Sequence, residues 1–391
     1  MRHRLSLKHL YVAALLLLCT LAAFVYGVLV GRFEYPPFRL VEGLHERFIK
    51  SAEQKERERQ AAARFFNPSP DYFLNDISTL ISIRSAADVE AKRQRLIDVI
   101  WGGRGYPREK LPASVEQNVH DKAFAGMANL GTIDKVVCEM DYGINSVAYH
   151  FHPLNANRRL IVYHAGHTES LVTVRRQISF FVGRGYAVLA LAMPLEGANS
   201  RPVVDVEGVG RMRLKTHAQF VYLDAPLRFF IEPVVVALNH VGKNHHYELL
   251  AMVGLSGGGW TTTLCAALDT RLARSYPVAG SVPEVLRDTW LDWGDFEQQL
   301  PELLRAANSV ELYLLGAYGS GRAQLQVLNR FDRCCFSGER HPFYESHLRA
   351  RLAELGGGGR FSVLLDATHQ QHMLSDFALG EIARDLESEE R

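Results

Sequence analysis

The chain has 391 residues, of which 47% are hydrophobic and 22% are charged, and its formal net charge is +1. This composition is typical of a globular protein with one large catalytic domain and smaller additions. The near-neutral charge, without a long basic stripe, excludes a protein built to bind nucleic acid. The spacing of the five cysteines and the histidines matches no zinc motif, so we expect no metal and no cofactor.

The first apolar segment covers residues 10–30 and contains no charged side chain. As a helix it would be about 31 Å long, which matches the ~30 Å hydrocarbon core of a bilayer. The preceding basic residues, Arg2, Arg4 and Lys8, favour a cytoplasmic N-terminus. We predict a cytoplasmic tip and signal-anchor transmembrane helix over residues 1–32, with the catalytic part on the periplasmic or extracellular face. The alternative is a cleaved signal peptide, whose apolar region is usually shorter, at ~7–15 residues.

Residues 33–130 are predicted to form a helical stalk and adaptor. The stretch 46–64 is rich in Glu, Lys, Arg and Gln, which is typical of a solvated helix. A second helix is expected to begin after Ser85 as N-cap and to run to Trp101, because its apolar residues recur at helical spacing. No residue pattern in this stretch indicates chemistry.

From residue 131 onward, short apolar runs alternate with helical segments. Strands are expected at residues 136–140, 146–151, 160–163, 186–192, 249–253, 276–279, 312–315 and 361–365. Helices are expected at residues 172–183, 220–241, 260–268 and 373–387. This alternation predicts an α/β domain over 131–391, with a mostly parallel central sheet covered by helices on both faces. The segment 284–308 interrupts the pattern and is a possible cap, in which Trp290 and Trp293 line a pocket or serve packing.

The sequence Gly254-Leu255-Ser256-Gly257-Gly258 fits the pattern G-x-S-x-G between an expected strand and an expected helix. A nucleophilic serine at this place sits on a strained turn that needs neighbouring glycines for close backbone approach. The start of the helix also favours negative charge developing near Ser256. A structural or phosphate-binding glycine turn is the alternative, although the Gly-Lys-Ser/Thr ending of a P-loop and the glycine spacing of a dinucleotide site are both absent.

Residues 134–391 resemble the α/β-hydrolase superfamily. The resemblance rests on the turn at Ser256, the loop His164-Ala165-Gly166-His167 after an earlier strand, and a late histidine after the last strand. In that superfamily the nucleophile is followed by an Asp or Glu and then by a His. The resemblance implies the fold and a carboxylesterase-like serine hydrolase, and it leaves the substrate open.

Two histidines after the last expected strand are candidates for the general base, and we prefer His372 to His369. The acid that orients the base is expected to be Asp332, the first carboxylate after the strand expected at 312–315. Asp366 at the tip of the last strand is its rival, with a turn-capping role as the other interpretation. The other candidates for the orienting acid are Glu339, Glu345 and Glu284.

An oxyanion hole requires two N–H donors aimed at one point. Gly257 follows the nucleophile and supplies one, and Gly166 or His167 is expected to supply the other. The alternative for the 164–167 loop is a tight turn with surface histidines. A metal site at His164 and His167 lacks a third ligand at useful spacing.

The expected function is hydrolysis of an ester or related acyl bond through an acyl-enzyme on Ser256. Two alternatives stay open, a noncatalytic hydrolase-like scaffold and an acyltransferase of the same fold. The expected partners are a small-molecule, glycan or lipid ester and, through residues 10–30, a membrane.

Overall fold

The computed structural model describes residues 7–33, 76–207, 209–287, 292 and 294–388. The chain divides into two compact units, residues 1–67 and residues 68–391, and each is described by itself. The stalk helix expected at 46–64 and the side chains of Trp290 and Trp293 lie outside the described residues.

The described part of the first unit is helix α1, Leu7–Phe33. Large apolar side chains along it are exposed, among them Tyr11, Leu17 and Phe24. A search of the described residues finds no helix with the combined length and apolarity needed to cross a bilayer. The helix expected at 10–30 is present as α1, but its assignment as a transmembrane span is not confirmed.

The second unit is organised around a nine-stranded sheet with the order β1-β2-β3-β5-β4-β8-β9-β10-β11. Strands β1, β2 and β3 are antiparallel, and the strands from β5 to β11 along this order run parallel to one another. The strands are β1 Ser114–Glu116, β2 Leu130–Cys138, β3 Ser146–Pro153, β4 Arg159–His164, β5 Ala187–Leu191, β8 Leu249–Leu255, β9 Arg274–Val278, β10 Ala323–Asn329 and β11 Arg360–Asp366. The expected α/β fold with a mostly parallel sheet is confirmed.

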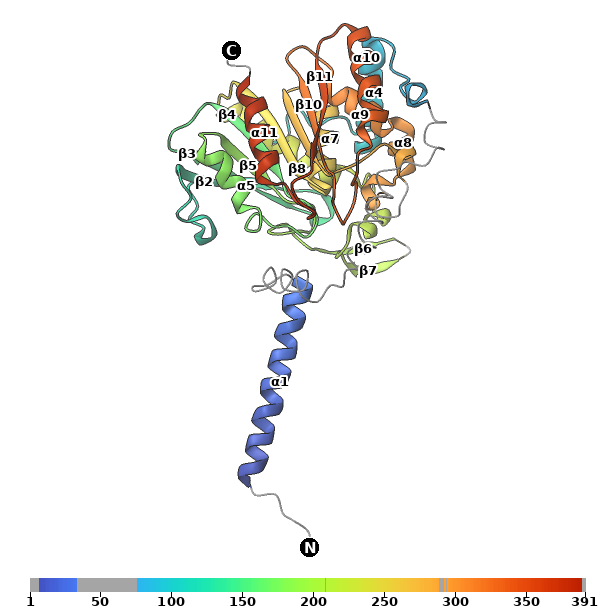
Figure 1. Ribbon diagram of the computed structural model, residues 1–391. Helices are drawn as coiled ribbons and strands as arrows, with labels where there is room; N and C mark the ends of the chain where they lie inside the picture. Colours follow the sequence, from blue (N-terminus) through green and yellow to red (C-terminus); the bar gives the residue numbers. More distant parts are fainter. Residues whose placement is uncertain (1–6, 34–75, 208, 288–291, 293, 389–391) are drawn as a thin grey trace. The chain divides into compact units, whose positions relative to one another are not determined.

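Helices cover both faces of this sheet (Figure 1). One face carries α5, Arg175–Gly183, and α11, Asp376–Glu387. The other carries α4 Ala86–Trp101, α6 Arg228–Asn244, α7 Gly257–Leu268, α9 Ser309–Ala317 and α10 Glu345–Leu355. Central strands are buried on both sides, so their sequences are continuously apolar rather than alternating.

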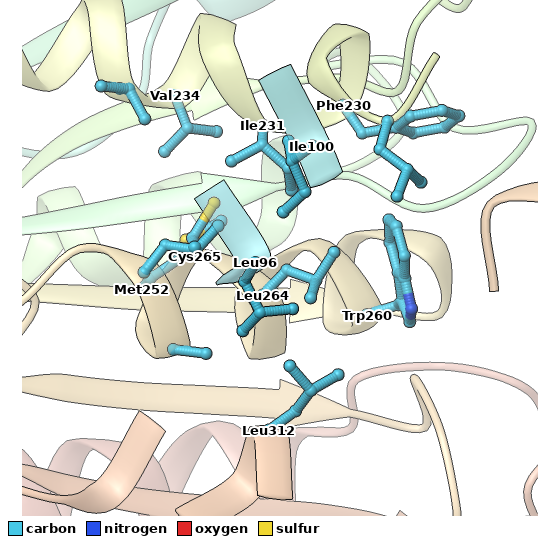
Figure 2. Packing of buried hydrophobic residues seen from close by; sticks show 14 of the residues in the cluster. Leu96, Ile100, Phe230, Ile231, Val234, Met252, Trp260, Leu264, Cys265 and Leu312 are labelled. Carbon is cyan, nitrogen blue, oxygen red and sulfur yellow. The ribbon is translucent and has the colours of Figure 1, made fainter. Parts of the chain in front are cut away.

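Helix α4 belongs to the core, as Figure 2 shows for Leu96 and Ile100 beside Ile231 of α6 and Leu264 of α7. The Ser85 side chain accepts a hydrogen bond from the Asp88 N–H, so the expected N-cap is confirmed. Strand β1 pairs with β2 and extends the sheet. Residues 76–130 of the segment that we expected to be a stalk and adaptor thus pack into the same unit as the sheet, and no boundary separates them from it at residue 130.

The strand expected at 312–315 is wrong, because these residues lie in the middle of helix α9, Ser309–Ala317. Every residue of α9 is buried, so apolar residues stand on all its sides and its sequence shows no helical periodicity. The strand at this point of the sheet is instead β10, Ala323–Asn329, which follows α9 directly. We missed β10 because two of its buried side chains, Gln324 and Gln326, are polar.

The segment expected to be a cap contains only short elements where it is described. They are the 3₁₀ helices Glu284–Leu286 and Phe296–Gln298 and helix α8, Pro301–Ala306. A two-stranded hairpin that we did not expect, β6 Val203–Val206 and β7 Gly210–Arg213, lies outside the main sheet.

Candidate active site

Ser256 lies on a sharp turn between the end of β8 and the start of α7, with φ 57° and ψ −122°. Residues other than glycine rarely adopt a positive φ, and this backbone conformation costs about 1–3 kcal/mol. Neighbouring backbone holds the turn in place. The Ser256 N–H donates to the Val278 carbonyl of β9 at 2.9 Å, and the Ser256 carbonyl accepts from the Trp260 N–H at 2.9 Å. This is the geometry expected of a nucleophile elbow.

Glycines beside Ser256 allow the backbone segments to approach closely. A Cβ atom on Gly254 would overlap the carbonyl of Gly258, and one on Gly258 would overlap the carbonyl of His164. The start of α7 therefore packs directly against the end of β4, from which the His164-Ala165-Gly166-His167 loop departs. The glycine pattern of the motif is explained by these contacts.

His372 and Asp332 are brought together by neighbouring strands. Asp332 follows β10 and His372 follows β11, and the last residues of these parallel strands, Asn329 and Asp366, are paired. The His372 Nδ1 lies 2.7 Å from the Asp332 Oδ2, while the Asp332 Oδ1 accepts from the Cys334 N–H at 2.8 Å. The Asp332 side chain is fully buried, whereas the His372 side chain is 21% exposed.

The contact with Asp332 determines the chemistry of His372. If Nδ1 carries the proton that it donates to Asp332, Nε2 is left with a free lone pair and can act as a base. Burial acts to lower the pKa of His372, but the hydrogen bond to Asp332 and its negative charge outweigh burial and raise that pKa. Asp332 lies three residues past the end of β10, so it follows a strand of the sheet closely, although not the one that we expected at 312–315.

The rival residues form a separate pair. The Asp366 carboxylate accepts from the N–H and the hydroxyl of Thr368, at 2.9 and 2.7 Å, and from the Ser375 hydroxyl. His369 Nε2 lies 3.2 Å from the same carboxylate. Ser375 is in turn the N-cap of α11. Asp366 therefore organises the loop after β11 and the start of that helix.

The other carboxylates that we weighed have partners elsewhere. Glu339 pairs with Arg330 at 2.5 Å, and Glu345 pairs with Arg349 at 2.5 Å. Glu284 accepts from the N–H of Ser309 at 3.1 Å. Of the acids considered for the base, Asp332 is thus the one that the structure places on His372.

The loop after β4 lies against the serine turn. A Cβ atom on Gly166 would come within 3.1 Å of the Ser256 Cβ, and the His167 ring lies directly over Gly257. The Gly257 N–H begins α7 and has no partner within that helix. Within the described residues the N–H of His167 also has no hydrogen-bond partner.

The N–H of Gly166, in contrast, is already engaged. It donates to the Glu169 Oε2 at 2.6 Å. Burial raises the pKa of Glu169, and the hydrogen bond from Gly166 opposes this in part. Of the two donors that we proposed for the second position of the oxyanion hole, His167 is therefore the one left available. We did not anticipate Glu169, because nothing in its local sequence indicates that contact.

The His167 ring contacts acidic groups from the segment 294–298. Its Nε2 lies 3.1 Å from the fully buried Glu297 carboxylate, and its Nδ1 lies 3.2 Å from Asp295. Burial acts to lower the pKa of His167, but Glu297 and Asp295 outweigh it and raise that pKa. His217 Nδ1 lies 3.1 Å from His167 Nε2. His167, His217 and Glu297 form a set of side chains capable of binding a metal ion.

A second such set includes the candidate base itself, with Cys334 and Cys335. The Cys335 sulfur lies 3.8 Å from the His372 Nδ1. All five cysteines of the chain are free thiols, so the adjacent pair does not form a disulfide.

Comparisons with known proteins reveal the same fold in several esterases. An acetyl xylan esterase from Paenibacillus sp. R4 is 15% identical, with a TM-score of 0.51 over 80% of this chain and 98% of that one. Acetyl xylan esterase 1 from Thermoanaerobacterium sp. JW/SL YS485 is 16% identical, with a TM-score of 0.50 over 82% and 98% of the two chains. A glucuronoyl esterase from Solibacter usitatus is 13% identical, with a TM-score of 0.50 over 77% and 93%.

No protein-family model and no curated protein matches the chain. The likeness to the esterases therefore establishes the α/β-hydrolase type of fold. One fold can host many activities, so the activity of this protein depends on the residues of its site.

Proposed function

We propose that this protein is a serine hydrolase that cleaves an ester bond through an acyl-enzyme on Ser256. The observation that carries the proposal is the 2.7 Å contact between His372 and the buried Asp332. This pair lies at the same edge of the sheet as the strained turn of Ser256. Ser256, Asp332 and His372 all follow the carboxyl ends of parallel strands.

In this reaction the His372 Nε2 takes the proton from the Ser256 hydroxyl as its oxygen attacks the carbonyl carbon of the ester. Asp332 stabilises the imidazolium that forms. The negative charge on the former carbonyl oxygen is held by the N–H groups of Gly257 and His167. His372 then protonates the departing alcohol, and later activates the water that releases the acid and restores Ser256.

The proposed substrates are small-molecule or glycan esters. The support is the shared fold with two acetyl xylan esterases and a glucuronoyl esterase, together with the absence of a cofactor requirement in the proposed steps. Lipid esters are a further proposed class, because the exposed apolar side chains of α1 favour contact with lipid.

We also propose that the catalytic unit acts on the periplasmic or extracellular face of a membrane, with the N-terminus inside. The basic residues before α1 and the exposed apolar side chains along it support this location. Protease added to cells that express the full chain, after any outer membrane has been opened and with the inner membrane left intact, tests it. Resistance of the catalytic unit under these conditions, with digestion only after complete lysis, would contradict the proposal.

The function is tested by measuring hydrolysis of 4-nitrophenyl acetate and of acetylated xylan with the purified chain. We expect turnover of the activated ester and its loss in Ser256→Ala. The exposed Ser388 provides a matched control, so Ser388→Ala is expected to retain wild-type turnover. Turnover that survives Ser256→Ala, in a variant with an unchanged circular dichroism spectrum, would refute the role of Ser256.

A further inference from the structure

A cluster of three histidines and an aspartate lies away from the catalytic edge, and three of its members stand on strands β2 and β3. The pairing of these strands sets Asp134 opposite His150. His152 is two residues further along β3, so its side chain is on the same face as that of His150. The next pair along the strands, Val136 and Ala148, belongs to the core on that face, so the cluster continues a buried row.

The fourth member of the cluster comes from a different part of the chain. His245 is the C-cap residue of α6, ahead of β8. Its ring centroid lies 5.0 Å from that of His150 and 5.2 Å from that of His152, and the His150 and His152 centroids are 4.0 Å apart. One potential ligand atom from each of the four residues lies within 4.8 Å of every other.

The buried His150 has a nitrogen with no hydrogen-bond partner. Its side chain is 0% exposed, its Nε2 lies 2.9 Å from the Tyr247 hydroxyl, and its Nδ1 is buried and unpaired. A buried polar nitrogen without a partner is costly and calls for an explanation. A metal ion at this point would supply the missing partner.

We propose that Asp134, His150, His152 and His245 bind one zinc ion. Imidazole nitrogens and carboxylate oxygens are ligands that zinc takes, and four ligands complete the tetrahedral coordination of a closed site. The site is a new assignment and does not depend on the function proposed for Ser256.

Groups around the cluster are arranged as they are around metal ligands. The Asp134 Oδ1 accepts from the Asn118 N–H at 2.9 Å, which leaves Oδ2 directed at His152, 2.9 Å from its Nε2. The contact of His150 with Tyr247 fixes the orientation of that ring. Outer partners of this kind orient the ligands of a metal and raise its affinity.

The position of the site indicates a structural role. β3 runs antiparallel to β5, so His152 lies near the end of β3 that faces the start of the parallel strand β5. This is the amino edge of the parallel strands, opposite to the edge where Ser256, Asp332 and His372 emerge. The metal would fasten β2 and β3 to the segment between α6 and β8 without touching the candidate catalytic residues.

The sequence alone did not reveal this site. His150 and His152 show only a His-x-His pair, and the remaining ligands stand at positions 134 and 245. Strand pairing and the path of α6 bring them together, and neither was readable from local spacing.

The test is zinc binding by the purified full-length chain, stripped with a chelator and then titrated with Zn²⁺ by calorimetry, with metal content measured after desalting. We expect about one zinc per chain and a rise in Tm on loading, because a ligand that binds the folded state stabilises it. Loading with Co²⁺ is expected to give the intense visible absorption of a tetrahedral site. A wild-type chain that binds no zinc would overturn the proposal.

Variants locate the metal. His152→Gln and His245→Gln are both at partly exposed positions. Each is expected to weaken zinc binding by more than ~10-fold, because even the loss of an outer partner of a ligand costs about that much. His240→Gln is the matched control, since His240 neighbours His245 and is not one of the four ligands. Unchanged affinity in both ligand variants would refute the site, as would binding that is lost instead in His217→Gln. Zinc removal is expected to lower Tm and leave ester turnover at 25 °C unchanged, which separates this proposal from that for Ser256.

Discussion

Two histidine–aspartate pairs occupy the same edge of the sheet, yet their surroundings differ. His372 is partly open to solvent, and its Nδ1 contacts Asp332, whose oxygens otherwise meet a backbone N–H and the Asn329 amide. His369 is less exposed, and its partner Asp366 is also bound by Thr368 and Ser375.

The difference lies in what each aspartate is free to do. Asp332 holds one imidazole in one orientation, which is what a general base requires. Asp366 ties the end of β11 to the N-cap of α11, and its contact with His369, at 3.2 Å, is longer than the 2.7 Å contact of Asp332 with His372. The same residue types thus form a candidate catalytic pair at one place and organise a loop at the other.

Replacing each histidine provides the sharpest test of this comparison. We expect His372→Ala to lower kcat/KM for an activated ester by about 10⁴-fold or more, because the base is lost. His369→Ala is expected to stay within about tenfold of the wild type, because a positioning change is smaller than the loss of the base. Steady-state kinetics on both variants measures the two losses. Equal losses of kcat/KM would contradict the different roles given to His372 and His369.

Replacing Asp332 should reduce activity and move its pH dependence. Asp332→Asn is expected to lower kcat by about 10³- to 10⁴-fold, since the ring loses its orienting acceptor. His372 must be neutral to act as a base, so activity rises as pH passes above its pKa, which Asp332 raises. The acidic limb of the kcat/KM profile should therefore shift to lower pH in Asp332→Asn. A limb that stays in place would show that another group controls it.

Replacing Asp366 should affect stability more than chemistry. Asp366→Asn is expected to lower the free energy of unfolding by about 2–3 kcal/mol, because hydrogen bonds to a buried charged group are weakened. Burial acts to raise the pKa of Asp366, but its bonds to Ser375 and Thr368 lower it overall. The stabilisation is then present above a pH of ~4 and fades as pH falls. Urea unfolding at two pH values measures this, and a variant as stable as the wild type would contradict it.

The smallest effect is expected at the helix start that Asp366 supports. Ser375 accepts from the Ala378 N–H at 3.0 Å as the N-cap of α11. Ser375→Ala should cost about 1 kcal/mol in stability, the usual value for a lost N-cap. Ester turnover is expected to stay unchanged at a temperature well below Tm. A large loss of activity would place Ser375 in the catalytic machinery instead.

The sequence predicted those parts of the site that depend on local structure. The strand, the turn with its glycines and the following helix around Ser256 are contiguous, so their pattern is visible in one stretch. The alternation of strands and helices gave the fold class for the same reason, and Ser85 marked the start of α4.

Other parts depend on contacts that local patterns do not record. The buried helix α9 lacks periodicity, so it was taken for a strand, and this shifted the expected place of the acid. The contact of Glu169 with Gly166 follows from the way one loop folds back on itself. Glu297 reaches His167 across more than a hundred residues, and no spacing rule predicts such a contact.

The central claim is that Ser256 is a nucleophile activated by His372. The most direct measurement is the rate at which a fluorophosphonate probe labels the purified chain, with the adduct mapped by mass spectrometry, in wild type, Ser256→Ala, His369→Ala and His372→Ala. We predict an adduct on Ser256 that forms at similar rates in wild type and His369→Ala and is lost in the other two variants. A well-folded wild type that is not labelled, or an adduct on another residue, would contradict the claim.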